Sequence, residues 1–218
     1  MELDVGALLH LLAHELRAPA SVAQGYLRML REDRLGPPAE RERAIAQAQA
    51  AIARVSELTH QASALADLLD GGRPAPVAAD LASVLAEAVA HTDLDEPVHV
   101  PMTATRVRLT RPDQVARALA ALIDASARPV RGRAPALAVR RAGGAGAVDV
   151  LIGPADAFAA LAAGPDADTA APLPVDRGGF GLALLLARVV LDAEGARAWT
   201  LAGTPAALAV RLQEDPTA

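Results

Sequence analysis

The sequence lacks three residue types on which many active sites depend. It contains no cysteine, which excludes disulfides, thiolate metal sites and thiol nucleophiles. It contains no lysine and no asparagine either, and all 21 basic residues are arginine, so no site here uses a lysine amine or an asparagine carboxamide. Aromatic residues make up only 2% of the chain against 52% hydrophobic residues. Any core is therefore built mainly from alanine, leucine and valine.

Two further absences restrict location and partners. No apolar run reaches the roughly 20 residues that a membrane-spanning helix needs, and the first residues, MELDVGALLHLL, lack the basic start of a signal peptide. We therefore expect a cytoplasmic protein without a membrane segment. The net charge of −5 argues against nucleic-acid binding.

The first third of the chain predicts a helical hairpin. Residues 3–32 place their apolar side chains within an arc of roughly 100° at helical spacing; these are Val5, Leu8, Leu9, Leu12, Leu16, Ala23, Tyr26, Leu27 and Leu30. After a turn with two prolines, a second helix to residue 70 carries a 3-4 repeat of Ile45, Ala48, Ile52, Val55, Thr59, Ala62 and Leu69, with Leu58 and Leu65 beside it. A lone hairpin leaves much of this stripe in water, so we expect a homodimeric four-helix bundle.

The remainder predicts an α+β sandwich with helices on one face of a sheet. Residues 71–77 read as a linker, and the two domains are expected at 1–72 and 78–214. The expected elements are helices over 79–91, 110–127 and 181–194, and strands over 98–100, 106–109, 137–139, 148–152, 199–201 and 208–212. Thr110 and Asp113 are placed as a capping box, and 153–178 is expected to be loose.

One histidine on the first helix is a candidate for chemistry. His14 lies about 185° from the middle of the apolar arc, so its side chain should face solvent. The carboxylate of Glu15 can accept a proton from the imidazole and make the other ring nitrogen nucleophilic. Pro19 should kink the helix one turn later. His10 is spaced to chelate a metal with His14, but no third ligand is suggested by spacing, so we expect no metal site.

This segment resembles a known family. The residues His-Glu-Leu-Arg-Ala-Pro from position 14, followed by Gly25-Tyr26, resemble the H-box of the dimerisation and phosphotransfer domain of two-component histidine kinases, over about residues 3–70. The resemblance implies that His14 is phosphorylated and that Glu15 is its acid/base. Ala18 stands where the family usually has Thr or Asn, and a methyl group cannot orient an attacking water, which places a phosphatase activity in doubt. We expect Arg17 to steer an acidic receiver pocket toward His14.

The second half is similar to the ATP-binding domain of the same family in its order of elements. Gly179-Phe180-Gly181-Leu182 resembles the end of the family's second glycine box, and Arg177 matches the first glycine of that box. The resemblance implies that Arg177, Gly179 and Gly181 are a vestigial nucleotide site. A short glycine motif is weak evidence, and a tight turn at the start of a helix explains it as well.

The other nucleotide-binding boxes are missing. Ala121 and Ala125 stand where the family has asparagines, the second of which holds magnesium, and Asp124 lies about 100° away around the helix. Ile152 replaces the aspartate that reads the adenine. Because phosphoryl transfer from ATP depends on positioning and on neutralising the phosphates, we expect ATP–Mg binding to be lost and no cofactor to be bound.

The leading hypothesis is a histidine phosphotransferase in a two-component phosphorelay. It would accept phosphate on His14 from a response-regulator receiver domain and pass it on to another. Two alternatives remain open: a divergent ATP-dependent sensor histidine kinase core, and a non-catalytic regulator that binds a kinase or receiver.

Overall fold

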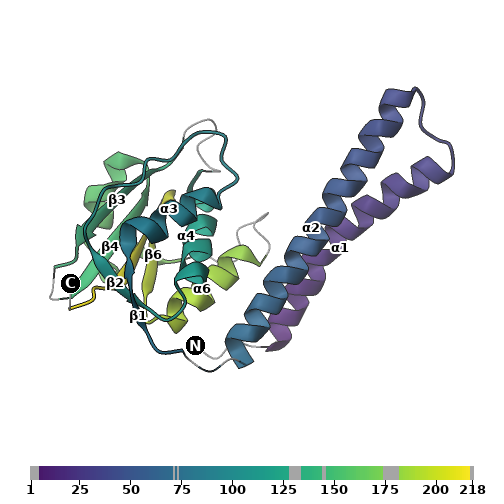
Figure 1. The fold of residues 1–218 in the computed structure, drawn as a ribbon. Coiled ribbons are helices and arrows are strands. Elements are labelled where there is room, and N and C mark those ends of the chain that lie inside the picture. The colour runs from purple at the N-terminus through teal and green to yellow at the C-terminus, as the bar shows by residue number, and fades with distance from the viewer. Residues whose placement is uncertain are drawn as a thin grey trace. The chain divides into compact units, whose positions relative to one another are not determined.

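A computed structural model describes residues 5–70, 72, 74–127, 134–143, 146–173 and 182–216, without the side chains of 5–8, 69, 70 and 205. The chain divides into two compact units, Met1–Asp70 and Gly71–Ala218 (Figure 1). The helical hairpin and the α+β sandwich that the sequence predicts are both confirmed.

The first unit consists of two antiparallel helices, α1 (Val5–Arg31) and α2 (Pro38–Asp70) (Figure 1). The residues of α2 that are buried against α1 recur at spacings of three, four and seven; they are Ala44, Ala48, Ala51, Leu58 and Leu65. This differs from the predicted stripe, since the larger Ile45 and Ile52 are 45% and 51% exposed. Alanine lets two helices approach closely, and the bulkier isoleucines lie beside the contact line.

The second unit begins with a small sheet and continues into a five-stranded one. Its elements are β1 (Val77–Asp80), α3 (Leu81–Ala90), β2 (Arg106–Leu109), α4 (Pro112–Ala127), β3 (Ala136–Arg141), β4 (Ala147–Gly153), η1 (Ala155–Ala157), α5 (Phe158–Leu161), β5 (Ala170–Pro172), α6 (Ala183–Ala193), β6 (Arg197–Leu201) and β7 (Thr204–Gln213). Strands β1 and β2 pair with each other, and the larger sheet is antiparallel throughout, in the order β3-β4-β7-β6-β5.

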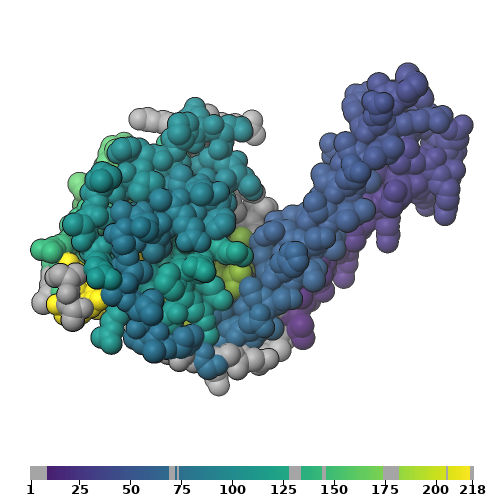
Figure 2. All heavy atoms as spheres, viewed as in Figure 1, coloured from purple at the N-terminus to yellow at the C-terminus, as the bar shows by residue number. Residues whose placement is uncertain are grey.

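The two faces of the larger sheet carry different layers. Alternate residues of β4 and β7, such as Val150, Ile152 and Val210, are buried on the face that α4 covers. The blue to teal residues of α3, α4 and the segment between α3 and β2 form most of the surface of this unit seen in Figure 2. On the opposite face, η1 and α5 place Leu161 against Trp199 in a second apolar cluster. The prediction of helices on one face only, with 153–178 loose, was therefore wrong, because this short alanine-rich segment has too little periodicity to reveal its helix.

Two further predictions in the second unit were wrong. The structure has no strand over residues 98–100, where prolines at 97 and 101 flank the segment and supply no backbone N–H. Conversely, β1 occupies the end of the predicted linker and the start of the predicted helix. The helix begins later, at Leu81, because Asp80 caps it by accepting a hydrogen bond of 3.1 Å from the backbone N–H of Ser83.

The start of α4 also differs from the prediction. Thr110 does not form a capping box with Asp113; instead, the carboxylate of Glu194, just after α6, accepts hydrogen bonds from the backbone N–H groups of Thr110 (2.7 Å) and Arg111 (3.0 Å). It also accepts one from the Thr110 hydroxyl. A residue 84 positions away in the sequence thus caps this helix.

Candidate functional site

His14 lies on α1 with its side chain 71% exposed, as the helical spacing predicts. Its Nδ1 lies 3.7 Å from Oε1 of Glu15, whose side chain is 25% exposed. This distance is longer than a hydrogen bond but lies within ion-pair range. A carboxylate on the Nδ1 side can hold that nitrogen's proton and leaves Nε2 as the ring nitrogen able to attack an electrophile.

The surroundings of His14 along α1 are accessible. Arg17 and Ala18, at the i+3 and i+4 positions, are both exposed and lie one turn further along the helix. Pro19 lies inside α1 and removes the hydrogen bond to the Glu15 carbonyl. His10 is also exposed. No group of three metal-ligating side chains occurs among the described residues.

The positions at which the resemblance would require nucleotide contacts are mostly apolar and buried. Ile152 is fully buried and Ala125 is 4% exposed. Asp124 is engaged, because it accepts a hydrogen bond of 3.3 Å from the backbone N–H of Asp93. The predicted remnant of the glycine box, with Arg177, Gly179 and Gly181, lies outside the described residues.

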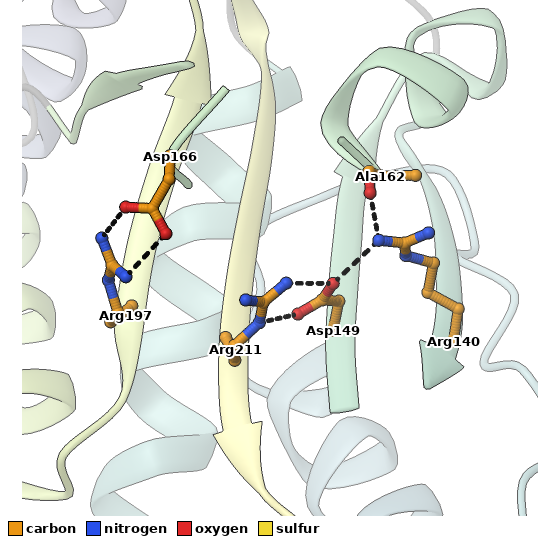
Figure 3. Close-up of polar contacts among 6 residues, drawn as sticks. All are labelled: Arg140, Asp149, Ala162, Asp166, Arg197 and Arg211. Carbon is orange, nitrogen blue, oxygen red and sulfur yellow. Dashed lines mark hydrogen bonds and ion pairs between the residues drawn. The ribbon is translucent and has the colours of Figure 1, made fainter. Parts of the chain in front are cut away.

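A polar cluster on the larger sheet was not predicted from the sequence. Asp149, on β4, has a fully buried side chain and lies opposite Arg140 of β3 and Arg211 of β7 in the strand register. Arg211 binds its carboxylate with two hydrogen bonds, of 2.7 Å and 3.0 Å, and Arg140 binds it at 3.2 Å (Figure 3). Two guanidinium groups thus compensate one buried carboxylate.

The cluster continues across the sheet. The hydrogen bonds that Arg211 donates to Asp149, together with the charge of that carboxylate, raise the pKa of Arg211. The guanidinium of Arg211 lies 5.6 Å from the centre of the Trp199 ring. On β6, Arg197 binds Asp166 through two nitrogens, at 2.8 Å and 3.2 Å (Figure 3). The sequence carried one signal of this: a lone aspartate within the apolar run of β4 needs a charged partner.

Comparison with solved structures defines the class of fold, which is that of a histidine-kinase-like core. The chain is similar to the Acinetobacter baumannii histidine kinase AdeS, with a TM-score of 0.67 and 17% identity over 93% of this chain and 98% of that one. It is also similar to full-length ShkA in a crystal structure with AMPPNP, with a TM-score of 0.51 and 16% identity over 95% of this chain and 45% of ShkA. No family model and no curated protein sequence matches.

None of the described helices is both long and apolar enough to cross a bilayer.

Proposed function

We propose that the protein is a histidine phosphotransferase of a two-component system, with His14 as the phosphate carrier. The observation that carries the proposal is an imidazole that is 71% exposed beside a carboxylate 3.7 Å from its Nδ1. Nε2 attacks the phosphorus of an aspartyl phosphate on a receiver domain. The bond between phosphorus and the aspartyl oxygen breaks, the receiver carboxylate leaves, and the Nδ1 proton is shared with Glu15. The second transfer, to another receiver, is the reverse of this step.

The proposed partner is a response-regulator receiver domain. Such a partner presents an acidic pocket and supplies its own magnesium, so this chain needs no metal of its own. The exposed guanidinium of Arg17, one turn past His14, supports docking by attracting that pocket. The fold shared with AdeS is consistent with a place in a two-component system.

The proposal excludes ATP as the phosphate donor. Ile152 is fully buried and Ala125 is nearly so, and neither offers a polar atom to adenine or magnesium. A magnesium nucleotide needs such ligands for both affinity and catalysis. We therefore propose that ATP–Mg binding is lost and that the second unit serves as a structural or docking module.

We further propose that the hairpin pairs with a second copy to form a four-helix bundle. Large apolar side chains on both helices stay 38% to 59% exposed in the single hairpin; they are Leu9, Val22, Leu27, Met29, Ile45 and Ile52. Such exposed apolar surface favours association, and two hairpins together bury it.

One specific observation favours a second function, an active histidine kinase core. The fold is shared with the histidine kinase AdeS and with ShkA over more than nine-tenths of this chain, and the ShkA structure contains AMPPNP. In that case ATP–Mg alone would label His14.

A non-catalytic regulator is the third candidate function, and in that case His14→Ala would leave function intact.

The deciding experiment is phosphate transfer from a phosphorylated receiver domain to the wild type and to His14→Ala. We expect labelling of the wild type and none of the variant, with dimerisation unchanged. His10→Ala, one turn away on the same exposed face, is the matched control and should be labelled normally. Labelling of His14 by ATP–Mg in the absence of a receiver would instead establish the kinase.

A further inference from the structure

Residues 162–169 form a segment that crosses one face of the sheet, between α5 and β5. Arginines of two strands bind this segment, and an arginine of a third strand lies beside it. Arg140 donates a hydrogen bond to the carbonyl of Ala162, and Arg197 binds Asp166 (Figure 3). Gly164 is buried, and a Cβ added to it would lie 3.4 Å from Nη2 of Arg211. We call residues 162–169 the strap.

The strap supplies a countercharge that the sheet itself lacks. Arg197 and Arg211 lie directly opposite each other on β6 and β7, and like charges in that position repel. Asp149 neutralises Arg211 from within the sheet. The partner of Arg197 is Asp166 of the strap, so the charge of Arg197 next to Arg211 is compensated by this pair while the strap is in place.

Asp149, Asp166 and the arginines that bind them form a row of charges across the sheet. The two carboxylates of this row differ in burial. Asp149 is fully buried between its arginines, and such a pair is little affected by salt. Asp166 and Arg197 are 78% and 56% exposed, and an exposed pair is weak and screened by ions. The contacts of Asp149 are therefore expected to persist in salt, whereas the Asp166–Arg197 pair can be released.

Few other interactions hold the strap to the sheet. One backbone hydrogen bond of 2.8 Å runs from the N–H of Ala202 to the carbonyl of Thr169. The strand that follows, β5, has only three residues and pairs with β6 at the edge of the sheet. The hydrogen bonds from Ala167 to Gly164 and from Ala170 to Ala167 are local turns. Segments with so few long-range contacts open at low free-energy cost.

We propose that the strap is a switch controlled by salt concentration. Salt screens the Arg197–Asp166 pair and releases the strap from the sheet there, while the sheet stays folded and Asp149 keeps its contacts with Arg140 and Arg211. Opening leaves Arg197 and Arg211 facing each other beside Trp199, which is otherwise 2% exposed. This device does not depend on His14 and is separate from the proposed phosphate transfer.

Trp199 is the chain's single tryptophan, so its fluorescence can follow the release. We measure acrylamide quenching from ~0.01 M to ~1 M NaCl, over which the Debye length falls from about 30 Å to about 3 Å. In the wild type the quenching constant should rise roughly twofold or more, as local opening admits the neutral quencher. Asp166→Asn should show the raised constant already at low salt.

The matched control is Asp33→Asn on the hairpin. Its partner Arg41 lies at 2.6 Å, and the two side chains are 77% and 50% exposed, close to the values for Asp166 and Arg197. This variant should quench like the wild type at every salt concentration. Adding Arg197→Thr to Asp166→Asn removes the repulsion with Arg211 and should restore part of the protection.

Amide hydrogen exchange provides the second measurement. In Asp166→Asn the amides of Ala170 and Ala202 should exchange faster, while those of β4 and β7 keep wild-type protection. If both sets accelerate together, the sheet unfolds as a whole and the proposal is wrong. It is equally wrong if neither quenching nor exchange changes in Asp166→Asn.

Discussion

At the scale of single residues, charge placement decides what this molecule can do. His14 and Glu15 are neighbours on an exposed helix, and Asp149 and Asp166 belong to a row of charges on the sheet. The first pair serves the proposed chemistry, and the second set serves structure. His14 and Asp149 differ in exposure: His14 is 71% exposed, whereas Asp149 is fully buried.

Replacing Glu15 with glutamine tests its proposed acid/base role. Glu15→Gln keeps the size of the side chain but removes its charge and its ability to accept a proton. We expect the rate of phosphate transfer to His14 to fall roughly 10²-fold, the low end for general acid–base catalysis. Glu42→Gln, at an exposed position of α2, should leave the rate unchanged. A rate for Glu15→Gln within about twofold of the wild type would remove Glu15 from the mechanism.

Acid should weaken the strap through Asp166. Hydrogen bonds from Arg197, then the charge of Arg197, and to a smaller extent that of Arg211, hold the pKa of Asp166 below its ordinary 3.8. The stabilisation is thus complete above the unfolded-state pKa and is lost as the pH falls through the lower folded-state pKa. An NMR titration of the Asp166 carboxyl carbon checks this. Arg197→Gln should move its pKa back toward 3.8, and an unchanged pKa would contradict the assignment.

At the scale of elements, residues far away in the sequence make contacts that decide where a helix begins and how closely two strands pack. The helix α4 has Pro112 at its first position, which suits a helix start, but its cap is the carboxylate of Glu194 after α6. Likewise β4 ends at Gly153 with φ of +134°, where an added Cβ would lie 2.3 Å from the carbonyl oxygen of Ala206. Only glycine allows β7 to approach so closely.

Removing the cap of α4 should destabilise the second unit measurably. Glu194→Ala leaves three donors of Thr110 and Arg111 without their acceptor, and we expect a loss of about 1–2 kcal/mol in the free energy of unfolding. Urea denaturation followed by Trp199 fluorescence measures it. Asp192→Ala, on α6 two residues before Glu194, is the control. The carboxylate of Asp192 lies 3.9 Å from Arg188, and its side chain is 48% exposed. A loss as large in Asp192→Ala would show that the cap is not responsible.

At the scale of the whole molecule, the hairpin's exposed apolar side chains point to a second copy. Ile45 and Ile52 are seven residues apart, so they lie almost in line on α2, and about half of each stays exposed. The buried Ala48 and Ala51 hold the hairpin together on a neighbouring face. One helix thus carries two apolar faces, as a helix in a four-helix bundle does.

A charge on the second face should separate the copies. We expect the wild type to have about twice the 22.3 kDa mass of one chain in light scattering, and Ile52→Glu to shift it toward a single chain at the same concentration. Ala50→Glu adds the same charge at an exposed position about 160° away on α2 and should preserve the dimer. A monomeric wild type, or an unchanged mass for Ile52→Glu, would contradict the bundle.

Much of the fold was predictable because its signals are local. Helical spacing identified α1 and α2, and alternation identified β2, β3, β4, β6 and β7. The strand β1 (VAAD) and the helix α5 (FAAL) were missed, because neither shows alternation or a helical period, whereas the equally short β2 (RVRL) alternates charged and apolar residues. For the candidate site, the exposed position of His14 follows from helix geometry alone, whereas the environment of Asp149 does not.

The sequence by itself determined the two helices, the outward direction of His14 and its adjacency to Glu15, because these depend only on residues within a few turns of one another. Only the tertiary structure decided that Asp149 lies between Arg140 and Arg211, and that Asp166 comes to rest on Arg197. Sheet register brings residues from distant parts of the chain to within about 5 Å, and no local pattern records which residues will meet. The chemistry proposed for His14 can therefore be predicted from the sequence, whereas the row of charges across the sheet can be recognised only in the folded structure.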